Sequence, residues 1–205
     1  MRMKTLLTLF ATLLLCIATT SPAFAITSYT FNYPQFNSAN VSYQTLSEPT
    51  TSISFQILNK LTFNASATDS VILKIVNGTT GTIYGVAFGF TKAGVLYISS
   101  VMPDWITLGE STWTTNDTIN VIIKSNGDLI VKKGTTTILK DYNVGNFTMR
   151  ALAANGAPYT CINGYLTVKT GANAMDDEIV VQWLPTIISL AMLGMVIGLL
   201  KKLSG

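Results

Sequence analysis

Residues 26–171 form a succession of short β-rich runs separated by turn dipeptides, and no window has the apolar spacing of an amphipathic helix. Eleven candidate strands lie at residues 28–32, 52–58, 61–64, 71–76, 82–90, 95–99, 118–124, 129–133, 136–140, 147–151 and 165–169. The turn dipeptides are Asn77-Gly78, Ala93-Gly94, Asn126-Gly127, Lys133-Gly134, Asn155-Gly156 and Asn163-Gly164. Because so many short strands exceed what one open sheet accommodates, we predict an all-β domain built as a two-sheet antiparallel sandwich, or jelly roll.

Two segments show the strand pattern most clearly. Alternate residues of 119–123 are apolar, and the Asn126-Gly127 dipeptide that follows favours a type I′ hairpin turn. In the candidate strand at 82–90, large apolar side chains alternate with glycines. This alternation predicts a central strand whose glycine side is closely approached by a neighbour.

The pattern around these two segments resembles a known fold. The runs at 85–90 and 93–98, Trp113, and the hairpin made by 119–123 and 127–131 are similar to concanavalin A-like and laminin-G-like jelly rolls. The resemblance implies a two-sheet sandwich with a lectin-like capacity to bind carbohydrate. An immunoglobulin-like sandwich is the alternative fold, although the chain lacks the Cys…Trp…Cys framework of that fold.

The two ends of the chain predict its topology. A basic start, an apolar run and the Ala23-Phe24-Ala25 motif are typical of a cleaved signal peptide, and the uncharged run at 179–200 is about 33 Å long as a helix, enough to span a bilayer. The predicted segments are a signal peptide at 1–25, a β-sandwich ectodomain at 26–171, an acidic juxtamembrane linker at 172–178, a transmembrane helix at 179–200 and a cytoplasmic tail at 201–205. The expected location is the plasma membrane or a viral envelope, as a single-pass type I protein with its ectodomain outside.

The predicted membrane helix carries a possible contact motif. Gly194 and Gly198 form a GxxxG pair, which allows two helices to approach closely and predicts self-association into dimers or a surface lattice. Lys201 and Lys202 follow the span, as expected for a cytoplasmic end. An alternative is that the C-terminal segment is a sorting signal removed by a transpeptidase, but no LPxTG or PEP box is present.

Composition indicates how the ectodomain is solubilised. Charged residues make up 11% of the chain, whereas about 25% is ordinary. The five Asn-x-Ser/Thr sequons, which we predict as glycosylation sites, lie at Asn40, Asn64, Asn77, Asn116 and Asn146. Residues 26–171 hold nine Lys/Arg and seven Asp/Glu, so no basic footprint for nucleic acid is present. Few charges, many sequons and no internal disulfide favour an archaeal or archaeal-viral surface protein.

The same composition excludes several kinds of chemistry. The chain has no histidine and, after removal of Cys16 with the signal peptide, a single cysteine, Cys161. Ser-His-Asp and Cys-His catalysis are therefore excluded, and we expect no cofactor, no metal site and no enzymatic activity. Some concanavalin A-like proteins cleave glycans with two acids on one strand, but no two acids of this ectodomain lie within five residues of each other. Polar loops at 116–117 and 141–143 are the only dense candidates for calcium.

One segment carries residues suited to a ligand. Asp104, Trp105, Glu110 and Trp113 combine two indoles with two carboxylates. In sugar recognition, an aromatic face covers the C–H surface of the sugar and an acid accepts protons from its hydroxyl groups. The alternative is one core tryptophan and one loop tryptophan.

We conclude from the sequence that the chain is a membrane-anchored surface glycoprotein with a structural or adhesive role, on a cell surface or a virion envelope. The expected partners are the membrane, further copies of the chain, and a glycan or protein ligand. A lectin-like receptor module that binds carbohydrate is the first alternative. A glycoside hydrolase is the more distant one.

Overall fold

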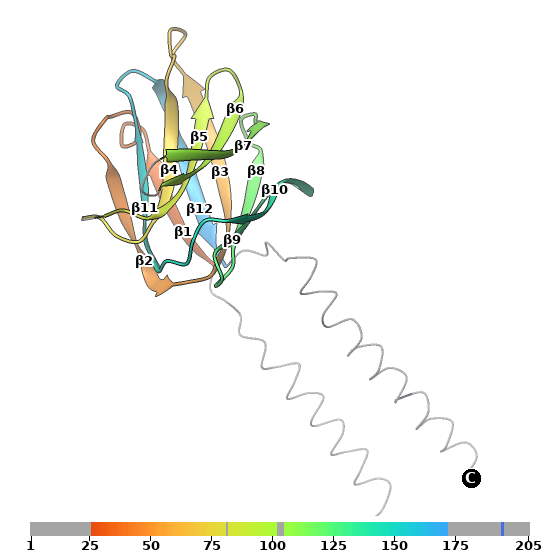
Figure 1. Cartoon of the computed structure of the whole chain (residues 1–205). Coiled ribbons are helices and arrows are strands. Elements are labelled where there is room, and N and C mark those ends of the chain that lie inside the picture. Colours follow the sequence, from red (N-terminus) through yellow and green to blue (C-terminus); the bar gives the residue numbers. More distant parts are fainter. Residues whose placement is uncertain (1–25, 81, 102–104, 172–193, 195–205) are drawn as a thin grey trace, which may run out of the picture.

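The protein is described here by a computed structural model, which covers residues 26–80, 82–101, 105–171 and Gly194. The predicted signal peptide, linker and tail lie outside these residues, as does the predicted transmembrane helix apart from Gly194. Among the described residues, no helix has both the length and the apolar character needed to cross a bilayer. Twelve β-strands are present in the described ranges, in two six-stranded sheets stacked face to face (Figure 1).

All strand pairs within the two sheets are antiparallel. In spatial order, sheet A consists of β1 (Thr27–Asn32), β12 (Cys161–Thr170), β3 (Ile53–Phe63), β8 (Thr118–Ile123), β9 (Asp128–Lys133) and β10 (Thr136–Asn143). In the same way, sheet B consists of β2 (Ser42–Thr50), β11 (Met149–Gly156), β4 (Ser70–Val76), β5 (Gly85–Thr91), β6 (Val95–Val101) and β7 (Trp105–Thr112). The predicted two-sheet antiparallel sandwich is confirmed.

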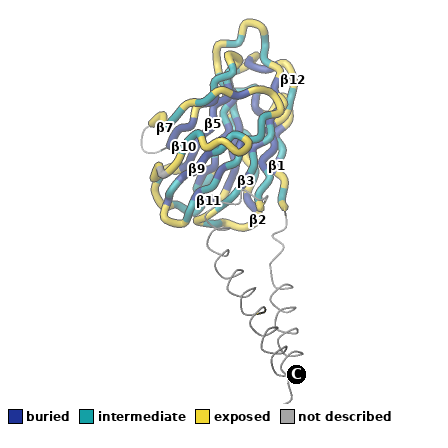
Figure 2. Tube along the Cα trace, turned by 90° about the vertical axis from the view of Figure 1, so that its right-hand side faces the viewer, coloured by how far each residue is buried: buried dark blue, intermediate teal, exposed yellow. Residues whose placement is uncertain are grey.

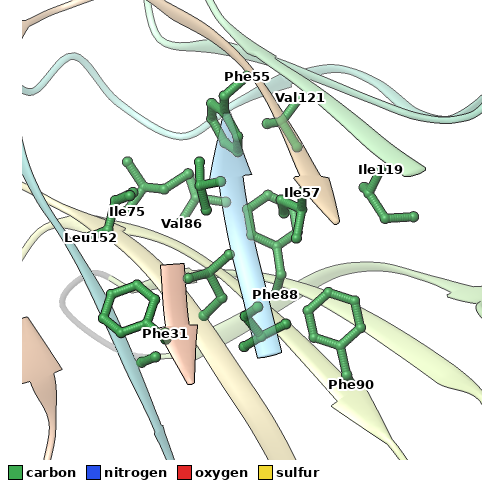
Figure 3. Close-up of a cluster of buried hydrophobic side chains, with 14 of the residues drawn as sticks. Phe31, Phe55, Ile57, Ile75, Val86, Phe88, Phe90, Ile119, Val121 and Leu152 are labelled. Atoms are coloured by element: carbon green, nitrogen blue, oxygen red, sulfur yellow. The ribbon is translucent and has the colours of Figure 1, made fainter. Parts of the chain in front are cut away.

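The core lies between the two sheets and follows from period-two alternation in their strands. Phe55 and Ile57 of β3 face Val86 and Phe88 of β5, and all four side chains are fully buried (Figure 3). The rings of Phe55 and Phe88 meet edge to face with centroids 6.3 Å apart. Along the strands the buried segments run through the middle of the molecule, whereas many loop residues at its ends are exposed (Figure 2).

Side-chain contacts close both open sides of the sandwich. On one side Gln44 of β2 donates its Nε2–H to the Thr30 carbonyl oxygen of β1 at 2.6 Å, and the Ser47 amide of β2 donates to Tyr29 Oη at 2.9 Å. On the other side β7 contacts β10, with Leu139 Cδ1 close to Gly109. The edge strands are therefore partly covered by each other, which limits their pairing with other chains.

The strand directions define two ends of the sandwich. Thr27 pairs with Thr170, so residues 26 and 171 lie at the same end, which we call the terminal end. The opposite end, which we call the distal end, carries the loops 33–41, 64–69, 113–117 and 157–160. The loops 77–84, 124–127 and 144–148 lie at the terminal end.

Several predicted strand limits are wrong. The sequence pattern missed β2 and β7, which are edge strands with a mostly exposed, polar composition and little alternation. The separate strands predicted at 52–58 and 61–64 are one strand, β3. Gly156 and Gly164 lie inside strands, where close backbone contacts rather than turns require glycine. The β8–β9 hairpin at Asn126-Gly127 and the central position of β5 are confirmed.

Candidate functional site

The outer faces of the two sheets differ in chemistry. The outer face of sheet A mixes polar and basic residues with aliphatic ones: it carries Thr30, Gln56, Asn120, Lys132, Thr167 and Lys169 together with Leu58, Ile122 and Ile130. The outer face of sheet B has a floor of small residues, namely Gly85, Ala87, Gly89, Ser99, Ala151 and Ala153. Aromatic side chains rise around this floor, so the outer face of sheet B is the candidate binding face.

Lys74 and Trp105 meet above the middle of this floor. Lys74, Ala87, Ser99 and Thr107 occupy one row across β4, β5, β6 and β7. The Lys74 ammonium lies 5.3 Å from the centroid of the Trp105 ring, within the range of a cation–π contact. Ala87 and Ser99 are only 1% and 7% exposed although they point outward, because the Lys74 and Trp105 side chains lie over them.

Tyr97 and Glu110 stand on the next row of the same face. They are direct cross-strand partners on β6 and β7, so both side chains point outward together. Tyr97 is 37% exposed, Trp105 is 53% exposed, and Glu110 is also exposed. The face therefore presents an indole, a phenol, a carboxylate and an ammonium to solvent.

The electrostatics of Lys74 are unusual for this chain. Burial of its stem among uncharged neighbours lowers the pKa of the Lys74 ammonium from its ordinary value. No carboxylate of the described residues pairs with it, and its ammonium lies over the Trp105 ring. Lys74 is thus a partly desolvated cation without a counter-ion in the described part of the chain.

The structure separates the two tryptophans predicted to act together. Trp113 is buried at the distal end, where its Nε1–H donates to the Val95 carbonyl oxygen at 3.1 Å and its ring packs against Phe90 with centroids 5.3 Å apart. Trp105 lies at the terminal end of β7 on the outer face. Of the four predicted ligand residues, Trp105 and Glu110 share the candidate binding face, Trp113 belongs to the core, and Asp104 lies outside the described residues.

Two open hollows lie at the ends of the sandwich. The hollow at the distal end is about 430 Å³ and includes Phe63, Lys92 and Trp113 in its lining. The hollow at the terminal end is about 350 Å³ and is lined by Asn77, Tyr84, Asn146, Phe147, Thr148 and Arg150. Two of the sequon asparagines thus line the second hollow, where attached glycans would occupy it.

All five sequon asparagines lie in loops at the ends of the sandwich. Asn40, Asn64 and Asn116 belong to the distal end, and Asn77 and Asn146 belong to the terminal end. Asn40, Asn116 and Asn146 are exposed, whereas Asn64 and Asn77 are half-buried. No sequon asparagine lies within a described strand, so glycans would be attached at the loops rather than on the outer face of either sheet.

Replacing Asn77 by Gln is expected to lower the free energy of unfolding by about 1 kcal/mol. Asn77 Oδ1 accepts the Tyr84 amide at 2.8 Å and its Nδ2–H donates to the Thr82 carbonyl oxygen at 3.4 Å, so this side chain holds the β4–β5 loop. The exposed Asn40 provides the matched control, and Asn40→Gln is expected to change stability by less than about 0.5 kcal/mol. Urea unfolding of protein from a host that does not glycosylate compares the two, and equal effects would contradict the role of Asn77.

Of the two segments weighed as calcium candidates, 116–117 lies in a loop and 141–143 lies at the end of β10, and hydrogen bonds engage polar side chains of both. Asp117 Oδ2 accepts the Thr114 amide at 2.7 Å, and Asn143 Nδ2–H donates to Asp128 Oδ1 at 3.2 Å. Within the described residues, no group of three or more Cys, Asp or Glu side chains is placed to hold a metal ion. The remaining reactive group, the Cys161 thiol, is buried, and burial raises its pKa to about 12.

The sequence did not identify Lys74 and Tyr97 as part of this face. A signal was present, because Lys74 is the single charge inside the apolar run 71–76 and therefore had to point away from the core. Which strand lies beside it could not be read from that run. The sheet order brings β7, and with it Trp105, to the same face.

Comparisons with known proteins bear on the fold. No protein-family model matches the chain, and no curated protein matches it. Among solved structures, a β-fructofuranosidase of Schwanniomyces occidentalis complexed with fructosyl-erythritol matches with a TM-score of 0.50 and 10% identity, over 71% of this chain and 34% of that one. This chain thus spans about a third of the length of that enzyme.

Two smaller structures also match. Sheep galectin-11 has a TM-score of 0.41 and 11% identity, over 62% of this chain and 97% of that one. The carbohydrate recognition domain of Emp46p has a TM-score of 0.48 and 7% identity, over 70% of this chain and 87% of that one. At such identities the likeness concerns the fold alone. Together with the strand topology, the match at a TM-score of 0.50 bears out the predicted fold, a two-sheet antiparallel sandwich of the jelly-roll kind.

Proposed function

We propose that this protein is an adhesive surface glycoprotein that binds glycans through the outer face of sheet B. Its C-terminal segment would hold it in a cell membrane or virion envelope. The observation that carries the proposal is that Trp105, Tyr97 and Glu110 share that face and are all exposed on it. Between the structural and the adhesive roles that the sequence leaves open, this face favours adhesion.

The chemistry of the face suits a saccharide. An exposed indole or phenol covers the apolar C–H surface of a sugar ring, and an exposed carboxylate such as that of Glu110 accepts hydroxyl protons. The lysine-bearing outer face of sheet A has, among the described residues, a single large aromatic ring near its end, Tyr165, and offers no such group of aromatic and acidic side chains.

The placement of the chain ends and sequons supports display at a surface. The polypeptide enters and leaves the sandwich at the terminal end, at residues 26 and 171. A membrane anchor at 179–200 would therefore place the distal end outermost. Asn40, Asn64 and Asn116 at the distal end, and Asn77 and Asn146 near the terminal end, would carry glycans around the sandwich. The binding face would remain accessible from the side.

Binding is favoured over hydrolysis by the placement of two acids. Glycoside hydrolysis uses two carboxyl groups about 5 to 10 Å apart. Asp117 and Asp128 lie before and after β8, at opposite ends of the sandwich, and each accepts hydrogen bonds that hold a turn. Glu110 has no described acid as its cross-strand partner, because Tyr97 stands there.

Replacing Trp105 by Ala is expected to weaken glycan binding at least about tenfold, because an aromatic anchor at the centre of an interface contributes more than about 1 kcal/mol. Binding of the purified full chain is measured first on a glycan panel and then, for the glycans that bind, by titration calorimetry. The matched control is Tyr165→Ala, which removes an exposed aromatic ring from the opposite sheet; Tyr165 is 38% exposed and Trp105 is 53% exposed. This control is expected to bind like the unchanged chain.

Thermal unfolding of both variants shows whether a loss of binding reflects a loss of fold. If the unchanged chain binds no glycan of the panel, the proposed function is wrong. If Tyr165→Ala weakens binding as much as Trp105→Ala does, the assignment to the outer face of sheet B is wrong. Reducing sugars released from a bound glycan would show hydrolysis instead of adhesion.

A further inference from the structure

The position of Lys74 indicates the charge of the glycan that this face would bind. Lys74 stands in the middle of the candidate binding face, and its neighbours along the row are Ala153, Ala87, Ser99 and Thr107, none of which carries a charge. Its ammonium contacts the Trp105 ring and pairs with no described carboxylate. A cation that has lost part of its hydration and has no counter-ion is a prepared site for an anion.

Glu110, the acid that the structure describes on β7, does not neutralise Lys74. Glu110 is the cross-strand partner of Tyr97, one row away from the row that contains Lys74 and on the edge strand β7. In the row of Glu110, the residue on β4 is Ile72, which is uncharged. The face therefore combines a central cation beside an indole with a carboxylate at its margin.

We propose that the outer face of sheet B binds an acidic saccharide, with the ammonium of Lys74 paired to a carboxylate on a sugar ring that stacks against Trp105. This inference rests on the proposed function and names the class of ligand for the same face. The exposed Thr107 hydroxyl lies in the same row as Lys74 and can bond a further oxygen of that sugar. Glu110 would then accept hydrogen bonds from the hydroxyl groups of a neighbouring, uncharged part of the glycan.

The nature of the Lys74 contact explains why an anion is expected rather than a hydroxyl group. A charge-assisted hydrogen bond is about twice as strong as one between neutral groups. A neutral sugar would leave the ammonium partly desolvated and unpaired, which is unfavourable. The preference for a carboxylate over a hydroxyl should therefore be at least about tenfold in affinity.

The test compares three oligosaccharides of equal length, namely an oligogalacturonide, the neutral galacto-oligosaccharide and its sulfated form. Titration of the purified full chain in detergent is expected to give at least about tenfold tighter binding of the oligogalacturonide than of the neutral oligomer. Lys74→Met keeps the apolar stem over Ala87 but removes the charge, and it should bring this ratio close to one. Lys74→Arg should restore most of the ratio.

The matched control is Lys169→Met, on the outer face of sheet A, which should leave the ratio unchanged. Thermal unfolding of each variant establishes that it is folded. Equal affinity of the unchanged chain for acidic and neutral oligomers would overturn the acidic ligand and leave the proposed function standing. A preference for the sulfated oligomer alone would overturn the assignment to carboxylates. Binding of no saccharide at all would overturn the proposed function as well.

Discussion

A Gly164→Ala variant is expected to lose about 3 kcal/mol or more of its free energy of unfolding, enough to unfold many domains of this size. Gly164 lies in β12, has φ of 133°, and pairs with Leu61 of the neighbouring strand β3. A Cβ atom at this position would be 2.0 Å from the Lys60 carbonyl oxygen and 2.9 Å from Leu61 Cα. Because both contacts are with backbone, no side-chain rotation relieves them, and β12 must separate from β3.

The loss at Gly164 extends beyond one pair of strands. β3 and β12 are adjacent in the middle of sheet A, and the Gly164 carbonyl oxygen accepts the Tyr33 amide at 3.0 Å, which holds the start of the loop after β1. A shift of β12 therefore disturbs the pairing with β1 and β3 together. Guanidinium unfolding followed by tryptophan fluorescence measures the effect, since the Trp113 indole is buried near the end of β3.

Gly134→Ala is the matched control for this prediction. Gly134 also has a positive φ, 56°, but a Cβ atom added there would have no other atom within 4 Å. Alanine at this position should therefore lower the free energy of unfolding by only about 1 kcal/mol, the cost of placing a non-glycine residue in the left-handed region. The difference between the two variants isolates the backbone contact between β12 and β3. Equal losses would show that the irregular register between Cys161 and Asn163 differs from the one described.

The sandwich could be predicted because its central strands carry their own signal. Buried strands such as β5 and β8 alternate apolar and small or polar residues, and turn glycines separate them. The edge strands β2 and β7 could not be predicted in this way, since each faces solvent along most of its length. Pairing with a neighbour, rather than an alternating sequence, makes these segments strands.

The candidate site shows more sharply where the sequence stops being informative. Trp105 and Trp113 are eight residues apart, so in an unbroken strand both indoles would point to the same face. Ser99 pairs with Thr107 whereas Ile98 pairs with Gly109, which leaves Leu108 as an extra residue in β7. This bulge reverses the alternation and turns Trp113 into the core. Nothing in the residues 105–113 announces the bulge, because it depends on the partner strand.

For Lys74, the sequence predicts the direction of the side chain but not its contact. Its outward direction follows from the apolar residues on either side of it, but its contact with Trp105 depends on two intervening strands, β5 and β6. Small residues at positions 87 and 99 make that contact possible, because larger side chains there would separate the ammonium from the indole. The binding face is thus a property of the sheet order.

A chain that ends at Gly171 is expected to move completely from the membrane fraction to the soluble fraction while keeping its fold. The proposed anchor at 179–200 has no charged residue, and its loss removes about 30 Å of apolar helix. The sandwich loses no strand, because β12 ends at Thr170, and the Gly171 amide still donates its hydrogen bond to the Ser54 carbonyl oxygen at 3.2 Å. Carbonate extraction and thermal unfolding measure the two parts of this expectation.

The matched control is a chain that ends at Leu200, which lacks the basic tail at 201–205 but keeps the whole apolar run. This chain should resist carbonate extraction, because the apolar length, rather than the tail, determines retention in the bilayer. Protease added to intact cells or particles should cleave the sandwich of the full chain, because the binding face must be exposed outside to meet a glycan. The chain enters and leaves the sandwich at the terminal end, so an anchor there would leave the rest of the domain accessible. Release of the full chain by carbonate, or protection of the sandwich from protease, would contradict the proposed anchor and the adhesive role together.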